Sequence, residues 1–157
     1  MFQGLELGQW DDITVSWSVP YRCLSSGIII VKAGSVLKKI CKKKKIILIE
    51  DNCESLGAMY HDRYTGTCGL MGSFSFFFSH HMQTMEGGMI LTDDKNLYEL
   101  CVSLRAHGWI RDLPKDNTIF KKTGNPFYDS FNFVVPGYNI RPLEMSGAIG
   151  SVQLRKL

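Results

Sequence analysis

A pair of histidines, His80 and His81, lies between an apolar segment and the sequence Glu86-Gly87-Gly88. An imidazole has a pKa near neutrality, so a histidine here suits a step that takes a proton and later gives one back. Neighbouring side chains on a strand or tight loop point in opposite directions, so the pair is poorly placed to chelate one metal ion. The chain has no H-E-x-x-H spacing, and we predict no metal site. A lone histidine beside an apolar strand is usually structural, so the role of His80 depends on its neighbours.

Asp51 follows an apolar run at residues 46–49, where a buried carboxylate is costly without a partner. The β-branched run 28–31, a helical pattern from 35 to 45 and the run 46–49 predict a parallel strand–helix–strand unit. Open α/β sheets bind ligands at the carboxyl ends of their strands, which is where Asp51 falls. An exposed strand-end carboxylate or a helix cap is the alternative for Asp51 taken alone.

Further elements are predicted along the rest of the chain. The sequence favours strands at 73–78 and 88–91 and a helix from 95 to about 106, whose N-terminus is supplied with Asp93 and Asp94. Residues 111–137 form a polar connection with proline and glycine. Pro142 then starts a closing amphipathic helix over 143–157. The residues expected to be buried on that helix are Leu143, Ile149, Val152 and Leu154.

Composition limits the classes of protein that fit. A chain of 157 residues with 45% hydrophobic residues can bury a core. The net charge is only +3, and the lysines at 38–39 and 42–45 are typical of a solvated helix face, with nucleic-acid or anionic-membrane binding as the alternative. Five scattered cysteines without a C-x-x-C pair indicate neither a disulfide framework nor a zinc site. With no signal peptide or membrane span, we expect a cytoplasmic protein.

Several of these residues together resemble the DegT/DnrJ/EryC1/StrS sugar aminotransferase family. The likeness rests on Glu50-Asp51, Ser75, Glu86-Gly87-Gly88 and Gly137-Tyr138-Asn139. It implies an α/β fold, part of the large domain of the PLP-dependent aspartate aminotransferases (fold type I), with a mostly parallel sheet and flanking helices. Residues 36–157 would be a partial PLP-binding large domain, residues 1–35 are poorly assigned, and the C-terminal small domain would be absent. The chain thus resembles a fragment.

The resemblance also implies roles in binding pyridoxal 5'-phosphate. In this family the aspartate of the Glu-Asp pair contacts the pyridine nitrogen, which assigns Asp51 to that contact. Glu54 replaces a glutamine that binds the ring hydroxyl, although it could instead cap a short helix near residues 55–59. Ser75 matches the serine that donates to the phosphate. Asn139 matches an asparagine that reaches the phosphate of the neighbouring subunit, which implies a homodimer with a shared active site; a turn role is its alternative.

The family's Schiff-base lysine stands six residues before the Glu-Gly-Gly, and here that position is His80. An imidazole cannot hold pyridoxal phosphate covalently, so the resemblance implies different chemistry, with His80 as the catalytic base and His81 as the fallback. The member that the chain resembles most is a lyase with this histidine, which uses pyridoxamine 5'-phosphate, recharged by L-glutamate, to remove the C3 hydroxyl of a GDP-linked 4-keto-6-deoxy sugar. Such dideoxysugars serve lipopolysaccharide O-antigen biosynthesis.

By the same resemblance, His107, Arg111 and Arg141 are assigned to the nucleotide-sugar substrate. Guanidinium groups pair with phosphate oxygens in a two-pronged geometry, which suits a sugar diphosphate. The alternative for Arg111, and for Arg105 nearby, is a cation at a helix end that interacts with the helix dipole.

Three other readings stay open. An iron–sulfur-dependent sugar dehydrase would need several cysteine ligands, and no cysteine follows Cys101. An ordinary nucleotide-sugar aminotransferase would need a lysine within the motif, yet none lies between Lys45 and Lys95. A catalytically incomplete fragment without enzymatic activity is the reading from another class.

Overall fold

The computed structural model describes residues 28–31, 35–60 and 62–157. The chain divides into two compact units, Met1–Phe74 and Ser75–Leu157. Most of the N-terminal segment 1–35, which was poorly assigned from the sequence, lies outside the described residues.

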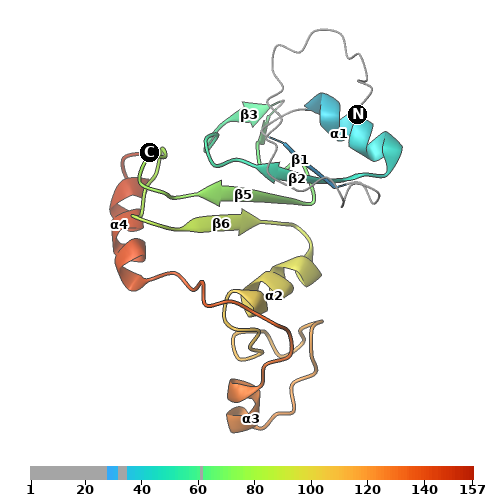
Figure 1. The fold of residues 1–157 in the computed structure, drawn as a ribbon, viewed down its shortest axis with the longest axis vertical. Helices are drawn as coiled ribbons and strands as arrows, with labels where there is room; N and C mark the ends of the chain where they lie inside the picture. The colour runs from blue at the N-terminus through green and yellow to red at the C-terminus, as the bar shows by residue number, and fades with distance from the viewer. Residues whose placement is uncertain (1–27, 32–34, 61) are drawn as a thin grey trace, which may run out of the picture. The chain divides into compact units, whose positions relative to one another are not determined.

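The first unit confirms the predicted strand–helix–strand arrangement. Strand β1 (Ile28–Val31) leads through helix α1 (Ser35–Lys44) to strand β2 (Ile47–Asp51), and the two strands pair in parallel (Figure 1). Strand β5 (Met71–Ser75) pairs in parallel on the other side of β2 and places Ser73 beside Asp51. Cys41 of α1 is buried with Leu48 of β2, which anchors the helix on the sheet. The lysines at 42–44 in the last turn of α1 are exposed, as a solvated face requires.

The connection from β2 to β5 carries a short antiparallel pair, β3 (Met59–Tyr60) with β4 (Arg63–Tyr64). The connection returns to the sheet through residues 66–69, which are held by the buried carboxylate of Glu50. Its oxygens accept hydrogen bonds from the backbone N–H groups of Gly66, Cys68 and Gly69, at 2.9, 2.6 and 2.5 Å. Glu50 is therefore a structural residue, and it fixes the loop that leads into β5.

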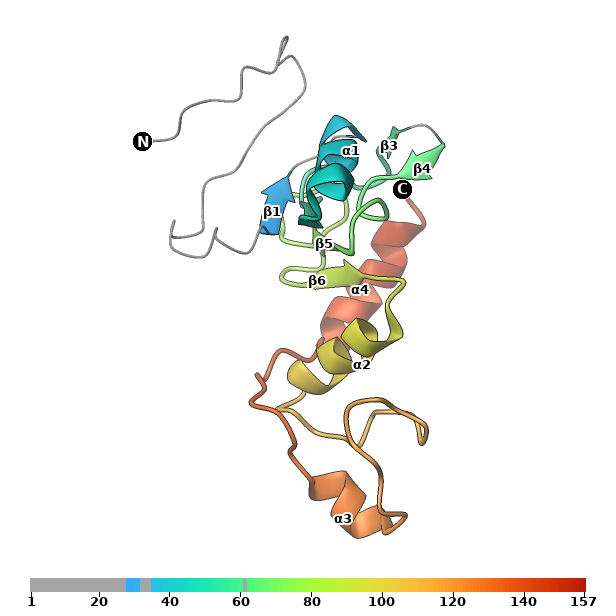
Figure 2. The ribbon, with the colours of Figure 1, turned by 90° about the vertical axis from the view of Figure 1, so that its right-hand side faces the viewer.

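The second unit contains strand β6 (Gly88–Leu91) and three helices, α2 (Lys95–Leu104), α3 (Pro126–Phe131) and α4 (Glu144–Leu154). Asp94 is the N-cap of α2, since its carboxylate accepts from the N–H groups of Asn96 and Leu97. Figure 2 shows α3 on the long connection between α2 and α4. The sequence predicted this connection without a helix, whereas Asn125 caps α3 and Pro126 occupies its first turn.

The predicted strand at 73–78 is displaced, because β5 ends at Ser75. Beyond it, the N–H of Phe76 donates to the carbonyl of Gly87, and the carbonyl of Phe76 accepts from the N–H of Thr84. The chain therefore leaves the strand to form a loop closed by these two bonds. The helix predicted to reach residue 106 ends at Leu104. Ala106 instead forms an antiparallel bridge with Asn139, which is incompatible with a continuing helix.

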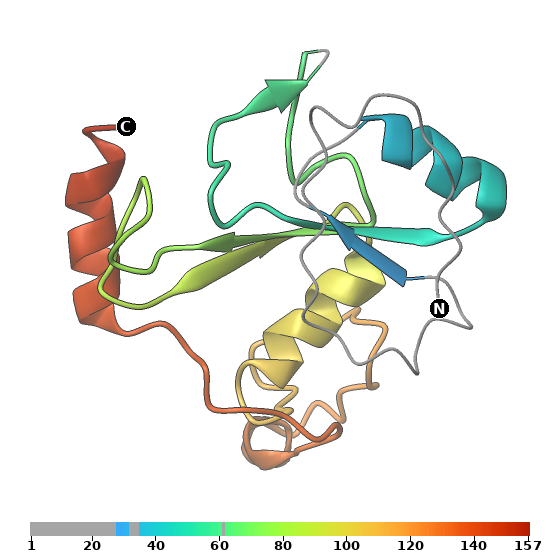
Figure 3. The ribbon, with the colours of Figure 1, turned by 45° about the horizontal axis from the view of Figure 1, so that its top comes forward.

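The prediction for the buried face of the closing helix is wrong at three positions. Leu143, Val152 and Leu154 are exposed, by 66%, 45% and 62%, and Ile149 is half-buried. The buried residue of α4 is Gly150, where an added Cβ would lie 3.1 Å from the Thr84 methyl group. The helix therefore packs through its small residues against the segment between β5 and β6, which runs beside it in Figure 3. In the described part of the chain, no helix has the length and apolar character needed to cross a membrane.

Candidate active site

Asp51 is the last residue of β2, and its side chain is half-buried. Oδ1 accepts a hydrogen bond from the N–H of Cys53 at 3.2 Å and one from the hydroxyl of Ser73 at 3.4 Å. Among the described residues, the hydrogen bonds of Asp51 all fall on Oδ1, which leaves Oδ2 for a further donor. The carboxylate is therefore not a helix cap, and the described residues leave one of its oxygens without a hydrogen bond.

Asn52, the residue after β2, forms hydrogen bonds that hold the end of this strand. Its backbone N–H donates to the carbonyl of Ser73, and its side-chain oxygen accepts from the Ser55 hydroxyl at 3.1 Å. The side chain is 1% exposed. Glu54 follows in the turn with an exposed side chain, and no helix forms at 55–59, so a helix-cap role for Glu54 is not supported.

Ser75 opens the second unit at the end of β5 and is half-buried. Its Oγ accepts a hydrogen bond from the N–H of Phe77 at 3.3 Å. The hydroxyl hydrogen is not used in that bond, so Ser75 can still donate to an acceptor such as a phosphate oxygen.

His80 lies on the loop that Phe76, Thr84 and Gly87 close. Its backbone N–H donates to the carbonyl of Phe77 at 3.0 Å, and its ring lies 6.1 Å from the Phe77 ring in an edge-on arrangement. His80 is half-buried, while His81 is exposed. The loop base is fixed by Thr84, which is 5% exposed and whose hydroxyl donates to the carbonyl of Glu86 at 2.9 Å. The imidazole of His80 thus lies on a loop whose base is held by hydrogen bonds.

The substrate residues predicted from the sequence gather around Trp109. The guanidinium carbon of Arg111 lies 3.9 Å from the centre of the indole, and that of Arg141 lies 5.4 Å from it. The ring of His107 lies 5.3 Å from the same indole. We name His107, Trp109, Arg111 and Arg141 the indole cluster. Arg105, by contrast, is the C-cap of α2, where a cation is favoured by the helix dipole.

Backbone pairing brings the two halves of the indole cluster together. The N–H of His107 donates to the carbonyl of Tyr138, and the N–H of Ile140 donates to the carbonyl of Arg105. Asn139 lies between them, exposed, in an antiparallel bridge with Ala106. This pairing places Asn139 next to the cluster, on an extended segment rather than in a simple turn.

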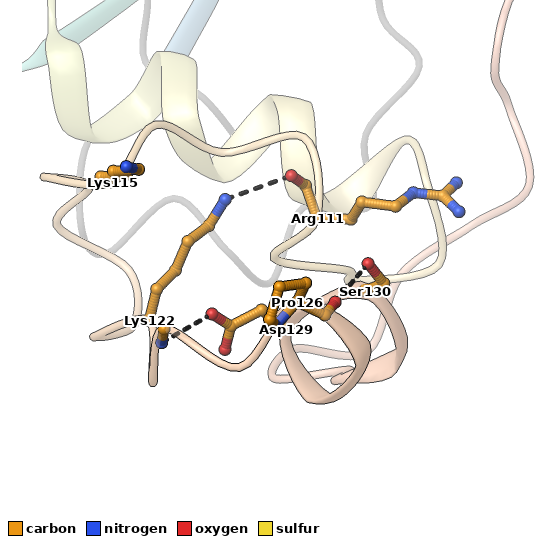
Figure 4. A pocket seen from close by; sticks show the side chains of 7 residues that line it. Arg111, Lys115, Lys122, Pro126, Asp129 and Ser130 are labelled. Atoms are coloured by element: carbon orange, nitrogen blue, oxygen red, sulfur yellow. Dashed lines mark hydrogen bonds between the residues drawn. The ribbon is translucent and has the colours of Figure 1, made fainter.

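A second cationic surface lies beside Arg111. It is an open cavity of about 490 Å³, lined by Arg111, Lys115, Lys122, Gly124, Pro126, Asp129 and Ser130. Figure 4 shows that the Arg111 side chain points away from Lys115 and Lys122. The ammonium group of Lys122 donates to the carbonyls of Arg111 and Leu113. Lys122 therefore holds the loop at 111–113 through two of its three donors.

Two carboxylates fix the connection that carries this surface. Glu99 of α2 is 1% exposed and accepts from the N–H and the hydroxyl of Thr118, at 2.7 and 2.8 Å. The bond from the Thr118 N–H holds the pKa of Glu99 below its ordinary value, against the opposing effect of burial. Asp129 of α3 accepts from the N–H groups of Thr123 and Gly124. Both carboxylates are structural.

Sequence reasoning missed Trp109 as part of the site. The signal was present in the alternation His107, Trp109, Arg111, which places an aromatic ring between two residues assigned to the substrate. It also missed the structural role of Glu50. The sequence next to Asp51 does not show whether an acidic residue holds a loop or binds a ligand.

Comparison with known proteins identifies the relatives of this chain. The model of the DegT/DnrJ/EryC1/StrS aminotransferase family matches residues 32–157. The chain is 57% identical over 122 residues to the GDP-4-keto-6-deoxy-D-mannose 3-dehydratase of Yersinia pseudotuberculosis, an alignment that covers 77% of this chain and 31% of that protein. The chain therefore spans about a third of the length of this curated relative.

Two solved structures of GDP-4-keto-6-deoxymannose-3-dehydratase have the same fold, each with a TM-score of 0.79 and 50% identity. Each match covers 85% of this chain and 36% of the other. One is a histidine-to-asparagine mutant with bound GDP-perosamine, and the other holds a trapped PLP-glutamate geminal diamine. These likenesses confirm the predicted fold class, the α/β fold of PLP-dependent aminotransferase-like proteins.

Proposed function

Because the chain belongs to the DegT/DnrJ/EryC1/StrS aminotransferase family, we propose that the protein carrying it is a 3-dehydratase dependent on pyridoxal and pyridoxamine phosphate. Its substrate would be GDP-4-keto-6-deoxymannose, from which it removes the C3 hydroxyl. One observation carries this proposal: His80 occupies the lysine position, six residues before Glu86-Gly87-Gly88, in a chain 57% identical to such a dehydratase. The proposal concerns the whole protein, with residues 36–157 assigned to its large domain.

The described residues fit the cofactor. Asp51 keeps Oδ2 available at a strand end, and a carboxylate there would hold the proton on the ring nitrogen. Ser75 retains a hydroxyl hydrogen for the phosphate. We assign Glu54 to the ring hydroxyl, since its exposed carboxylate can share a proton with that oxygen. When bound, the cofactor supplies an amine that reacts with the sugar ketone and a ring that withdraws electrons.

We assign proton transfer to His80. One ring nitrogen of the imidazole would take a proton from the methylene carbon of the bound cofactor and return it to the C3 hydroxyl as the C3–O bond breaks. The electron pair left at that carbon would displace the hydroxyl, which leaves as water. A histidine suits this exchange because its ordinary pKa is close to neutral pH. The hydrogen bonds that hold the His80 loop support the assignment. A catalytic base must be held within hydrogen-bond reach of the proton that it moves.

We further assign His107, Arg111 and Arg141 to the substrate. Their gathering around one indole supports a common ligand, and guanidinium groups suit the diphosphate of a GDP-sugar. The relatives with bound GDP-perosamine and with PLP-glutamate support a GDP-linked substrate and L-glutamate as amino donor.

The proposed functional unit is a homodimer in which Asn139 reaches the cofactor phosphate of the partner subunit. Its exposure on an extended segment supports such a reach. The proposed location is the cytoplasm, and the proposed product serves the synthesis of a deoxysugar for lipopolysaccharide.

The test compares His80→Asn with its neighbour His81→Asn. The protein is incubated with pyridoxal phosphate, L-glutamate and GDP-4-keto-6-deoxymannose, and the 3-deoxy ketosugar and released ammonia are measured. We expect His80→Asn to retain the cofactor and to lower turnover by about 10²- to 10⁴-fold, the usual contribution of a general base. His81→Asn should stay close to the wild type because its side chain is exposed next to the same loop.

Three results would contradict the proposal in different ways. Loss of turnover in His81→Asn alone would show that His81, and not His80, is the catalytic base. Full turnover in His80→Asn would remove the histidine from the chemistry. A product that keeps its C3 hydroxyl and gains an amine, without ammonia release, would identify an aminotransferase.

A further inference from the structure

Trp109 is the centre of the indole cluster. The residues around it are assigned to the substrate, but Trp109 itself has no assigned role. Two guanidinium groups lie over its ring, Arg111 at 3.9 Å and Arg141 at 5.4 Å from the ring centre. Cations within about 6 Å of an indole centre are attracted by the negative charge of its π face. The one ring therefore attracts both cations.

This attraction matters because the two arginines would otherwise separate. Both side chains are exposed, and two like charges near one another repel. Among the described residues, the carboxylate of Asp112 lies 3.7 Å from Nε of Arg111, in an exposed ion pair that contributes little. Backbone pairing brings the two segments together, and the indole is the group that both guanidinium groups then contact.

The ring itself is held firmly. Phe133 packs on it with ring centres 5.3 Å apart, and residues 109 and 133 form an antiparallel bridge. The indole N–H is buried and has no hydrogen-bond partner among the described residues. What Trp109 offers to its surroundings is therefore the face of the ring and not a hydrogen bond.

The backbone beneath the ring is also specialised. His107 has a left-handed backbone with φ of 60°, a conformation that costs energy for a residue with a side chain. Gly108 follows with φ of 83°. An added Cβ on Gly108 would overlap the carbonyl oxygen of Val135, so the two segments approach as closely as backbone allows. Strain of this kind is tolerated where the surrounding structure fixes a functional arrangement.

We propose that Trp109 is a positioning residue that holds the guanidinium groups of Arg111 and Arg141 together to receive the diphosphate of the nucleotide sugar. Two guanidinium forks held at one ring match the several oxygens of a diphosphate, whereas a nucleoside offers no phosphate oxygens to bind. This inference rests on the proposed function, because it takes the GDP-linked sugar as the ligand.

The test measures the binding of GDP and of guanosine by calorimetry to the wild-type protein and to Trp109 variants. Trp109→Leu removes the π face, and Trp109→Phe keeps an aromatic face. We expect Trp109→Leu to weaken GDP binding by about fivefold to tenfold and Trp109→Phe to recover most of the loss. Guanosine binding should be the same in all three proteins. Phe127→Leu is the control, because Phe127 is an exposed aromatic residue of the same unit outside the cluster.

Each other outcome decides against the inference. GDP binding by Trp109→Leu at the wild-type level would overturn the positioning role and leave the proposed function in place. An equal loss for GDP and guanosine would make Trp109 a general structural residue. A wild-type protein that does not bind GDP would overturn the proposed function and the inference with it. If Trp109→Leu does not fold, Trp109→Met removes the same π face with an unbranched, flexible side chain that can adapt to the space left by the indole, and the same outcomes apply.

Discussion

Several carboxylates in this protein are stabilised by backbone N–H groups rather than by cations. Glu50 binds three N–H groups of its loop, and Asp129 binds those of Thr123 and Gly124. Such bonds satisfy the carboxylate oxygens of a buried acid. Asp51 differs because one of its oxygens remains available, and this difference separates a candidate ligand from structural acids of the same residue type.

At the residue scale, we predict an acid-dependent loss of stability from Asp129. The hydrogen bond from the Thr123 N–H holds the pKa of its carboxyl below the ordinary value, against the opposing effect of burial. The unfolded chain then binds more protons than the folded one between the two pKa values, so this stabilisation is present above the ordinary pKa and is lost as pH falls through the folded one.

The measurement is the melting temperature of the wild type and of Asp129→Asn from about pH 3 to pH 7. We expect the wild type to be the more stable near neutrality and the difference to shrink below about pH 4. A difference that stays constant across this range would show that the charge of Asp129 does not stabilise the fold.

At the scale of elements, the proposed substrate residues depend on two chain segments that cross with almost no space between them. Gly108 and Gly137 lie at this crossing, and an added Cβ on either would overlap the backbone of the other segment. Because His107 and Arg141 lie on opposite sides of the crossing, its geometry decides whether they meet at Trp109.

We predict that Gly108→Ala is much more destabilising than Gly124→Ala. Both glycines have a left-handed backbone, with φ of 83° and 84°, so both substitutions incur the same conformational cost of about 1 kcal/mol. An added Cβ on Gly124 meets nothing, whereas on Gly108 it meets the Val135 carbonyl. We therefore expect Gly108→Ala to lower the free energy of unfolding by more than about 3 kcal/mol in denaturant titrations. Equal losses would show that the crossing can relax.

At the scale of the whole molecule, the second unit exposes many large apolar side chains in this chain. Phe127, Tyr138, Ile140 and Leu143 are each exposed by 66% or more. Large exposed apolar surfaces on a folded chain indicate contact with other protein surface. The chain spans 31% of the length of its curated relative, so the proposed partner subunit and the rest of a longer protein are both sources of such cover.

A shared site predicts complementation between two inactive variants. In a dimer of His80→Asn and Asn139→Ala subunits, one site carries both changes and the other carries neither. After equal amounts are mixed, denatured and refolded, we expect about a quarter of the wild-type dehydratase activity, because half of the dimers are mixed and each has one intact site. Activity no higher than that of the separate variants would place Asn139 and His80 in the same subunit's site.

Local sequence patterns determined a large part of this protein. The β-branched and apolar runs predicted β1 and β2, and Asp94 correctly marked the start of α2, because caps and strand patterns depend on neighbouring residues. The resemblance carried by Glu50-Asp51, Ser75 and Glu86-Gly87-Gly88 indicated the family, which the comparison confirms. The roles of the individual site residues stay predictions.

Only the tertiary structure decided what depends on distant segments. The position of Trp109 between Arg111 and Arg141 follows from backbone pairing across the 107–140 region, which no local pattern encodes. The apolar periodicity of α4 predicted the wrong buried face, because a close approach at Gly150 outweighed it. Short-range preferences act on a few neighbouring residues, whereas the contacts of a binding site depend on which distant backbones can approach each other.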